Sequence, residues 1–206
     1  MNYKIKNHTL IIFILILTLN QLTKASKPTF SFECLIQNAE YGFEFMYHSS
    51  EMFDFNRSAT SVYVYPLEHL SNLDRVRWLI QSTRNSSNLQ TVLIKSFRSN
   101  RYLCASNGHL ERFMKRRKVY LSNHFEKETC EWMLEDAENN SKEDNRDQLI
   151  MKSYITNVKY KEGLYAPSYF FKQDKLKRNL YLWFDENEKF KSRKFNWIID
   201  CSNIHF

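Results

Sequence analysis

Basic side chains gather in two short stretches of this 206-residue chain, and their chemistry suits binding of anions. The first stretch places five cations within seven residues, and the second lies before a strand-like run in the last third of the chain. Guanidinium and ammonium groups bind sulfate or phosphate oxygens by charge attraction and paired N–H donors. The predicted polyanion-binding residues are Arg112, Lys115, Arg116, Arg117, Lys118, Lys175, Lys177 and Arg178. The alternative is that these stretches are solvated loops that only keep the protein soluble.

Residues for enzyme chemistry do not form a recognisable pattern. The sequence contains no GxSxG, HExxH, P-loop or GxGxxG motif. The histidines past the N-terminal segment stand alone in the sequence, which favours surface or structural roles: His48, His69, His109, His124 and His205. We therefore expect no catalytic site, no cofactor and no metal.

The N-terminal segment has the composition of a secretory signal peptide. Lys4 and Lys6 precede the apolar run LIIFILILTL, and small residues frame a cleavage site after Ala25. A membrane-spanning helix needs about twenty apolar residues, and this run is shorter. We expect cleavage of residues 1–25, secretion, and one mature domain over residues 26–206 with neither membrane insertion nor a nucleic-acid partner. Cleavage removes three lysines and no acid, so the formal charge falls from +7 to +4.

The cysteines and three glycosylation sequons fit an extracellular protein. An even number of cysteines in a secreted chain indicates disulfides, and neither a CxxC pair nor a histidine pair has the spacing of a zinc site. The four cysteines are Cys34, Cys104, Cys130 and Cys201. The sequons predict glycosylation at Asn56, Asn85 and Asn139.

Short apolar runs bounded by polar stretches predict an all-β chain. Runs such as Val62–Tyr65 and Thr91–Lys95 are β-branched or aromatic, and no long segment carries a helical apolar stripe. One turn of helix is expected between Pro66 and Val76.

The chain also repeats itself. Three units, at about residues 32–82, 91–136 and 148–201, carry the same order of landmarks, and each closes on a tryptophan followed two residues later by Ile or Leu. The closing tryptophans are Trp78, Trp132 and Trp197.

This threefold pattern resembles the β-trefoil superfamily. The resemblance implies a β-trefoil of three pseudo-repeats whose first and last strands meet. A bridge between Cys34 and Cys201 would then join the termini, and Cys104 with Cys130 would close a bridge within the second unit. The alternative is a β-sandwich whose tryptophans fill its core.

Three secreted β-trefoil families differ in how well they match. Ricin-type lectins carry Gln two residues before the repeated Trp, whereas this chain has Val76, Cys130 and Phe195 there. The segment from Arg101 to Leu110 resembles the central strand-turn-strand of fibroblast growth factors. Soybean-type Kunitz inhibitors share the fold, and Arg57 or Arg84 would be the reactive basic residue in that case.

The sequence predicts a secreted, non-enzymatic binding protein. Its partner is expected to be an extracellular glycan of the heparan type or a cell-surface receptor. The alternative is a Kunitz-like protease inhibitor.

Overall fold

The computed structural model describes residues 31–53, 56–83, 91–111, 116–137, 150–171, 174–183 and 192–201, and the side chains of residues 56, 57 and 109–111 lie outside this description. The predicted signal peptide, residues 1–25, also lies outside it. The described chain is built from antiparallel strands, so the all-β prediction is confirmed.

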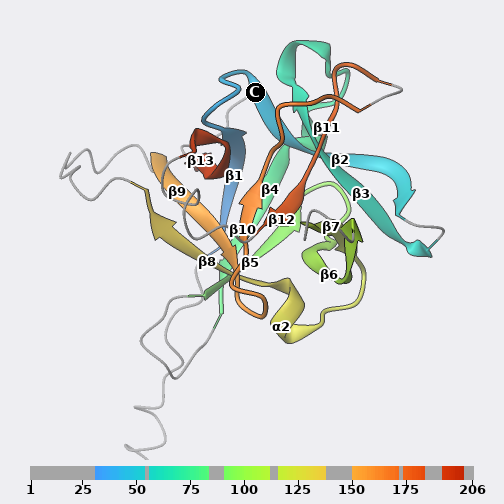
Figure 1. Cartoon of the computed structure of the whole chain (residues 1–206), viewed down its shortest axis with the longest axis vertical. Helices are drawn as coiled ribbons and strands as arrows, with labels where there is room; N and C mark the ends of the chain where they lie inside the picture. The colour runs from blue at the N-terminus through green and yellow to red at the C-terminus, as the bar shows by residue number, and fades with distance from the viewer. Residues whose placement is uncertain are drawn as a thin grey trace, which may run out of the picture.

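Six strands close into a ring (Figure 1). Each pairs with two neighbours in the order β1, β4, β5, β8, β9, β13 and back to β1. Their bounds are Ser31–Asn38, Arg77–Ser82, Thr91–Ser96, Glu131–Asp136, Ile150–Asn157 and Asn196–Asp200. A closed ring leaves none of these six strands with an unpaired edge.

Six of the seven remaining described strands form three antiparallel pairs, called hairpins below. These are β2 (Glu44–Phe53) with β3 (Asn56–Pro66), β6 (Tyr102–Glu111) with β7 (Arg116–Ser122), and β10 (Gly163–Tyr165) with β12 (Tyr181–Trp183). Strand β7 pairs with both β3 and β12, and the short β11 (Arg178–Asn179) pairs with β3, so the hairpins also join one another.

Helical structure is limited to short turns. The expected turn between Pro66 and Val76 is present as two 3₁₀ turns, η1 (Leu67–His69) and η2 (Leu73–Arg75). A further 3₁₀ turn, η3 (Arg193–Phe195), precedes β13, and α2 (Lys127–Cys130) precedes β8.

The three closing tryptophans make the same hydrogen bond. The indole Nε1 of Trp78 donates to the carbonyl oxygen of Met46 at 2.9 Å. Trp132 donates to Leu103 at 2.9 Å, and Trp197 donates to Leu164 at 3.0 Å. All three rings are fully buried in one core cluster with aliphatic residues from the ring and the hairpins. Each indole therefore fixes one hairpin to the strand that closes its unit while its ring fills the core.

Both disulfides implied by the β-trefoil resemblance are present. Cys34 bonds to Cys201 across 167 residues of sequence, and Cys104 bonds to Cys130 across 26 residues. In the chain-entropy model, loops of these lengths stabilise the fold by about 5 and about 3.5 kcal/mol. The first bridge ties the start of the ring to its end.

Candidate functional site

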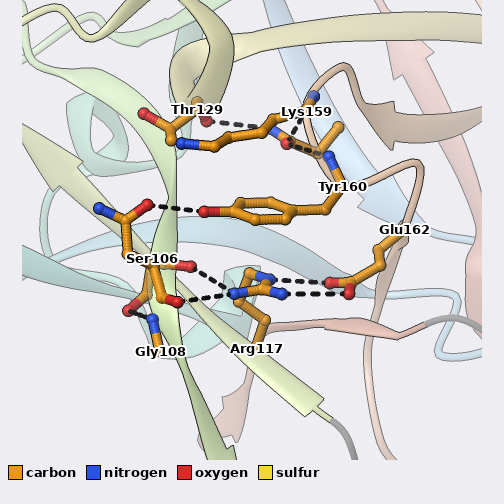
Figure 2. Close-up of polar contacts among 9 residues, drawn as sticks. Ser106, Gly108, Arg117, Thr129, Lys159, Tyr160 and Glu162 are labelled. Carbon is orange, nitrogen blue, oxygen red and sulfur yellow. Dashed lines mark hydrogen bonds and ion pairs between the residues drawn. The ribbon is translucent and has the colours of Figure 1, made fainter.

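In the basic stretch of the second unit, the side chains of Arg116 and Arg117 are buried. Arg117 contacts the protein through hydrogen bonds and an ion pair. Its Nε donates to Glu162 Oε2 at 3.0 Å, and its Nη1 donates to the carbonyl oxygens of Ser106 and Asn107, each at 3.1 Å. Only 5% of Arg117 is exposed, and Glu162 is also buried. Figure 2 shows the guanidinium between the two carbonyl groups on one side and the carboxylate on the other. This pair joins the second unit to the third.

Tyr160 covers the guanidinium of Arg117. The ring centroid of Tyr160 lies 3.5 Å from Arg117 Cζ, which is stacking distance for a cation over an aromatic face. The Tyr160 hydroxyl donates to Asn107 Oδ1 at 2.6 Å (Figure 2). The protein itself therefore provides a counter-ion for Arg117, acceptors for its N–H groups, and an aromatic ring against one face of its guanidinium.

Arg178 is enclosed in the same manner between the third unit and the first. Its Nε donates to Glu44 Oε2 at 2.7 Å, and its guanidinium lies 3.9 Å from the ring centroids of both Tyr41 and Phe170. It is 6% exposed, and its Nη1 also donates to the carbonyl oxygen of Ser168.

Arg116 lies among aromatic rings. Its Nη1 donates to the Tyr169 hydroxyl at 2.6 Å, and its guanidinium lies 5.1 Å from the centroid of Trp183. It is also within 5.8 Å of the centroids of Tyr165, Tyr169 and Tyr181. Only 8% of Arg116 is exposed.

The predicted lysines differ from one another in their burial and in their contacts. Lys177 pairs with Glu51 at 2.5 Å and with Asp174 at 3.4 Å. Lys118 is half-buried, with its ammonium 5.2 Å from the ring centroid of Phe53. Lys175 is exposed.

Three of the eight predicted polyanion-binding residues, Arg116, Arg117 and Arg178, are buried. Arg117 and Arg178 are buried against carboxylates, carbonyl oxygens and aromatic rings, and Arg116 is buried against aromatic rings and the Tyr169 hydroxyl. The three guanidinium groups therefore expose little surface to a polyanion in solution. Buried charges are usually paired, and Glu162 and Glu44 pair with Arg117 and Arg178 across units. A basic run in a sequence does not reveal such partners. Among the described residues Arg116 has no carboxylate, and its buried Nε has no hydrogen-bond partner.

Several predicted residues lie outside the described part of the chain. Arg112, Lys115, Asn85, Asn139 and Arg84 belong to the ranges without description, as does His205. Asn56 begins β3, but its side chain and those of Arg57 and His109 are not described. The sequons and the inhibitor loop therefore stay predictions.

The buried His48 was not singled out by the sequence. Its Nδ1 lies 3.0 Å from Ser96 Oγ and its Nε2 lies 3.2 Å from Thr60 Oγ1, and the side chain is 7% exposed. Burial, followed by the charges of Arg101, Arg75 and Arg98, lowers the pKa of His48 to about 4. The ring is therefore neutral at pH 7 and bonded on both nitrogens within the core.

Within the described ranges, histidine, cysteine and acidic side chains do not gather into any group of three or more that could hold a metal ion. The described helices are all too short and too polar to cross a membrane.

The turn between β1 and β2 presents an apolar side chain to solvent. Phe43 is 84% exposed, the highest exposure among the large hydrophobic residues of the described chain. It borders a shallow groove of about 430 Å³ whose lining residues are Gln37, Gly42, Phe43, Phe45, Leu67 and Glu68. The sequence does not distinguish Phe43, because it stands in a short turn and is one of sixteen phenylalanines.

Comparison with known proteins supports a β-trefoil-type fold. The SDF2-like protein from Arabidopsis thaliana superposes with a TM-score of 0.61 at 9% identity, over 83% of this chain and 93% of that one. A salivary protein of the cysteine- and tryptophan-rich (CWRC) family from Culex quinquefasciatus gives a TM-score of 0.53 at 14% identity, over 84% and 95%. The designed threefold-symmetric protein ThreeFoil gives 0.54 at 9% identity, over 82% and 97%.

At these identities the likeness extends to the fold alone. No protein-family model matches the sequence, and no curated protein matches it either.

Proposed function

We propose that this chain is a secreted, non-enzymatic binding protein, a β-trefoil of three pseudo-repeats that engages a cell-surface receptor protein through Phe43. The observation that carries the proposal is the exposure of Phe43 beside an apolar groove. An isolated aromatic ring held away from the core is a typical anchor of a protein–protein interface.

The turn that presents Phe43 is held in place on both sides. The residue two before it, Tyr41, stacks on Arg178, and the residue after it, Glu44, pairs with the same guanidinium. The Phe43 carbonyl oxygen accepts from the Leu67 N–H at 3.2 Å. A turn held in this way loses little backbone entropy when its exposed Phe43 binds a partner, which favours affinity.

The chemistry around Phe43 indicates what kind of surface it fits. Phe43, Phe45 and Leu67 line the groove together with the exposed carboxylate of Glu68. A complementary partner offers an apolar pocket bordered by basic side chains. A protein surface provides this combination, whereas a sugar site needs several converging hydrogen-bonding groups.

Saturable binding of the labelled mature protein to cells tests the proposal. Phe43→Ala is expected to weaken binding by at least about tenfold, the loss typical of an anchor residue. Met52→Ala is the matched control because Met52 is also exposed, at 59%, and lies at the other end of β2. Both variants should unfold at the wild-type temperature. Equal binding by the two variants would contradict the proposal.

A further inference from the structure

Arg116 differs from the other two buried guanidinium groups because it lacks a counter-ion. Arg117 pairs with Glu162, and Arg178 pairs with Glu44. No described carboxylate pairs with Arg116, although its side chain is only 8% exposed. A buried charge without a counter-ion is costly to a fold, so the exception requires an explanation other than stability.

The N–H donors of Arg116 are largely unused within the described chain. Its Nη1 donates to the Tyr169 hydroxyl at 2.6 Å, and its Nε is buried without a hydrogen-bond partner. A guanidinium has five N–H donors. Glu111 stands opposite Arg116 in the β6–β7 ladder, and its side chain lies outside the described set. Within the described residues, Arg116 therefore retains donors for a carboxylate.

Aromatic rings surround this guanidinium without supplying a negative charge. The ring centroids of Tyr165, Tyr181 and Trp183 lie 5.4, 5.8 and 5.1 Å from Arg116 Cζ, and that of Tyr169 lies 5.7 Å away. Attraction between the cation and these ring faces offsets part of the cost of burial. The same apolar surroundings strengthen the attraction of the guanidinium for an incoming anion.

Two exposed aromatic side chains connect this place to the turn of Phe43. Tyr169 and Phe170 are each 43% exposed. The Phe170 ring centroid lies 3.9 Å from Arg178 Cζ, and Tyr41, two residues before Phe43, lies at the same distance from that atom. Exposed aromatic surface therefore extends from the Phe43 turn to the Tyr169 ring.

We infer that Arg116 binds an acidic side chain of the cell-surface receptor, with Tyr169 and Phe170 packed beside it. The inference rests on the proposed receptor binding by Phe43 and adds a second contact of different chemistry. A carboxylate accepts paired, charge-assisted bonds from a guanidinium. Tyrosine and arginine are also enriched among the residues that dominate protein interfaces. A protein is favoured over an acidic sugar because the exposed rings beside Arg116 continue to the Phe43 turn.

Saturable cell binding of Arg116→Met tests the contact. This variant should bind at least about tenfold more weakly, because it loses a charged hydrogen bond to the receptor. Its unfolding temperature should equal or exceed that of wild type, since no described carboxylate loses a cation. Lys159→Met is the control: it removes an exposed cation 5.5 Å from the Tyr160 ring centroid and should change binding less than about twofold.

Two results with these variants would overturn the inference. One is wild-type binding by Arg116→Met. The other is a drop in its unfolding temperature as large as that of Arg117→Gln, which would show that Arg116 has an internal counter-ion. If Phe43→Ala weakens binding and Arg116→Met does not, this inference alone fails. If neither variant weakens binding, the proposed function fails as well.

A second measurement leaves Arg116 in place. Tyr169→p-benzoylphenylalanine should crosslink the same membrane protein as Phe43→p-benzoylphenylalanine, and Lys159→p-benzoylphenylalanine should crosslink none. Absence of that protein from the products of position 169 would contradict the contact. Sialidase treatment of the cells should leave binding unchanged, and a loss of binding after treatment would assign Arg116 to an acidic sugar and overturn the inference.

Discussion

Arg117 Nε and Glu162 Oε2 lie 3.0 Å apart, with both side chains buried and each contributed by a different unit. Tyr160, two residues before Glu162, stacks on the same guanidinium. Arg178, Glu44 and Tyr41 make a parallel arrangement between the third unit and the first. Two of the cations that the sequence assigns to a ligand, Arg117 and Arg178, therefore hold neighbouring units together.

Removing the Arg117 charge should destabilise the protein. Arg117→Gln leaves Glu162 buried without its cation, and we expect a loss of about 3 kcal/mol in the free energy of unfolding. Urea denaturation followed by tryptophan fluorescence measures it. Lys175→Gln serves as the control, because this exposed lysine should change stability by less than about 0.5 kcal/mol. If both variants unfold at the same urea concentration, Arg117 is not a structural residue.

His48 should make stability fall on mild acidification. Its pKa is about 4 in the folded protein and 6.5 in the unfolded chain, so between these values the unfolded state binds the additional proton. The contribution of neutral His48 to the free energy of unfolding is fully present above about pH 6.5. It decreases as the pH falls and is lost below about pH 4, a total of about 3 kcal/mol.

Denaturation of wild type and His48→Gln at pH 7, 6 and 5 measures this effect. Gln can still reach hydroxyl groups, such as those of Ser96 and Thr60, but has no charge to gain. The variant should lose less stability than wild type over this range. Parallel losses in the two proteins would show that another group is responsible.

The sequence predicted the strands and the tryptophan closures because both depend on local patterns. Short apolar runs such as Thr91–Lys95 and the order of Trp78, Trp132 and Trp197 are visible without coordinates. The cysteine pairing followed from the fold that these repeats resemble.

The candidate sites could not be predicted in the same way because they depend on which segments meet. Arg117 and Glu162 are 45 residues apart, and Arg178 and Glu44 are 134 apart. The exposure of Phe43 depends on how its turn is held. A run of basic residues identifies charge, but partners contributed by other units decide whether that charge faces solvent.

Photo-crosslinking from position 43 on living cells tests the central claim most directly. Phe43→p-benzoylphenylalanine keeps an aromatic side chain at the exposed turn, and Met52→p-benzoylphenylalanine places the same group at the far end of β2. The proposed function predicts a crosslinked membrane protein from position 43 that unlabelled wild type competes away, with none from position 52. Crosslinking from both positions alike, or from neither, would contradict a receptor contact at Phe43.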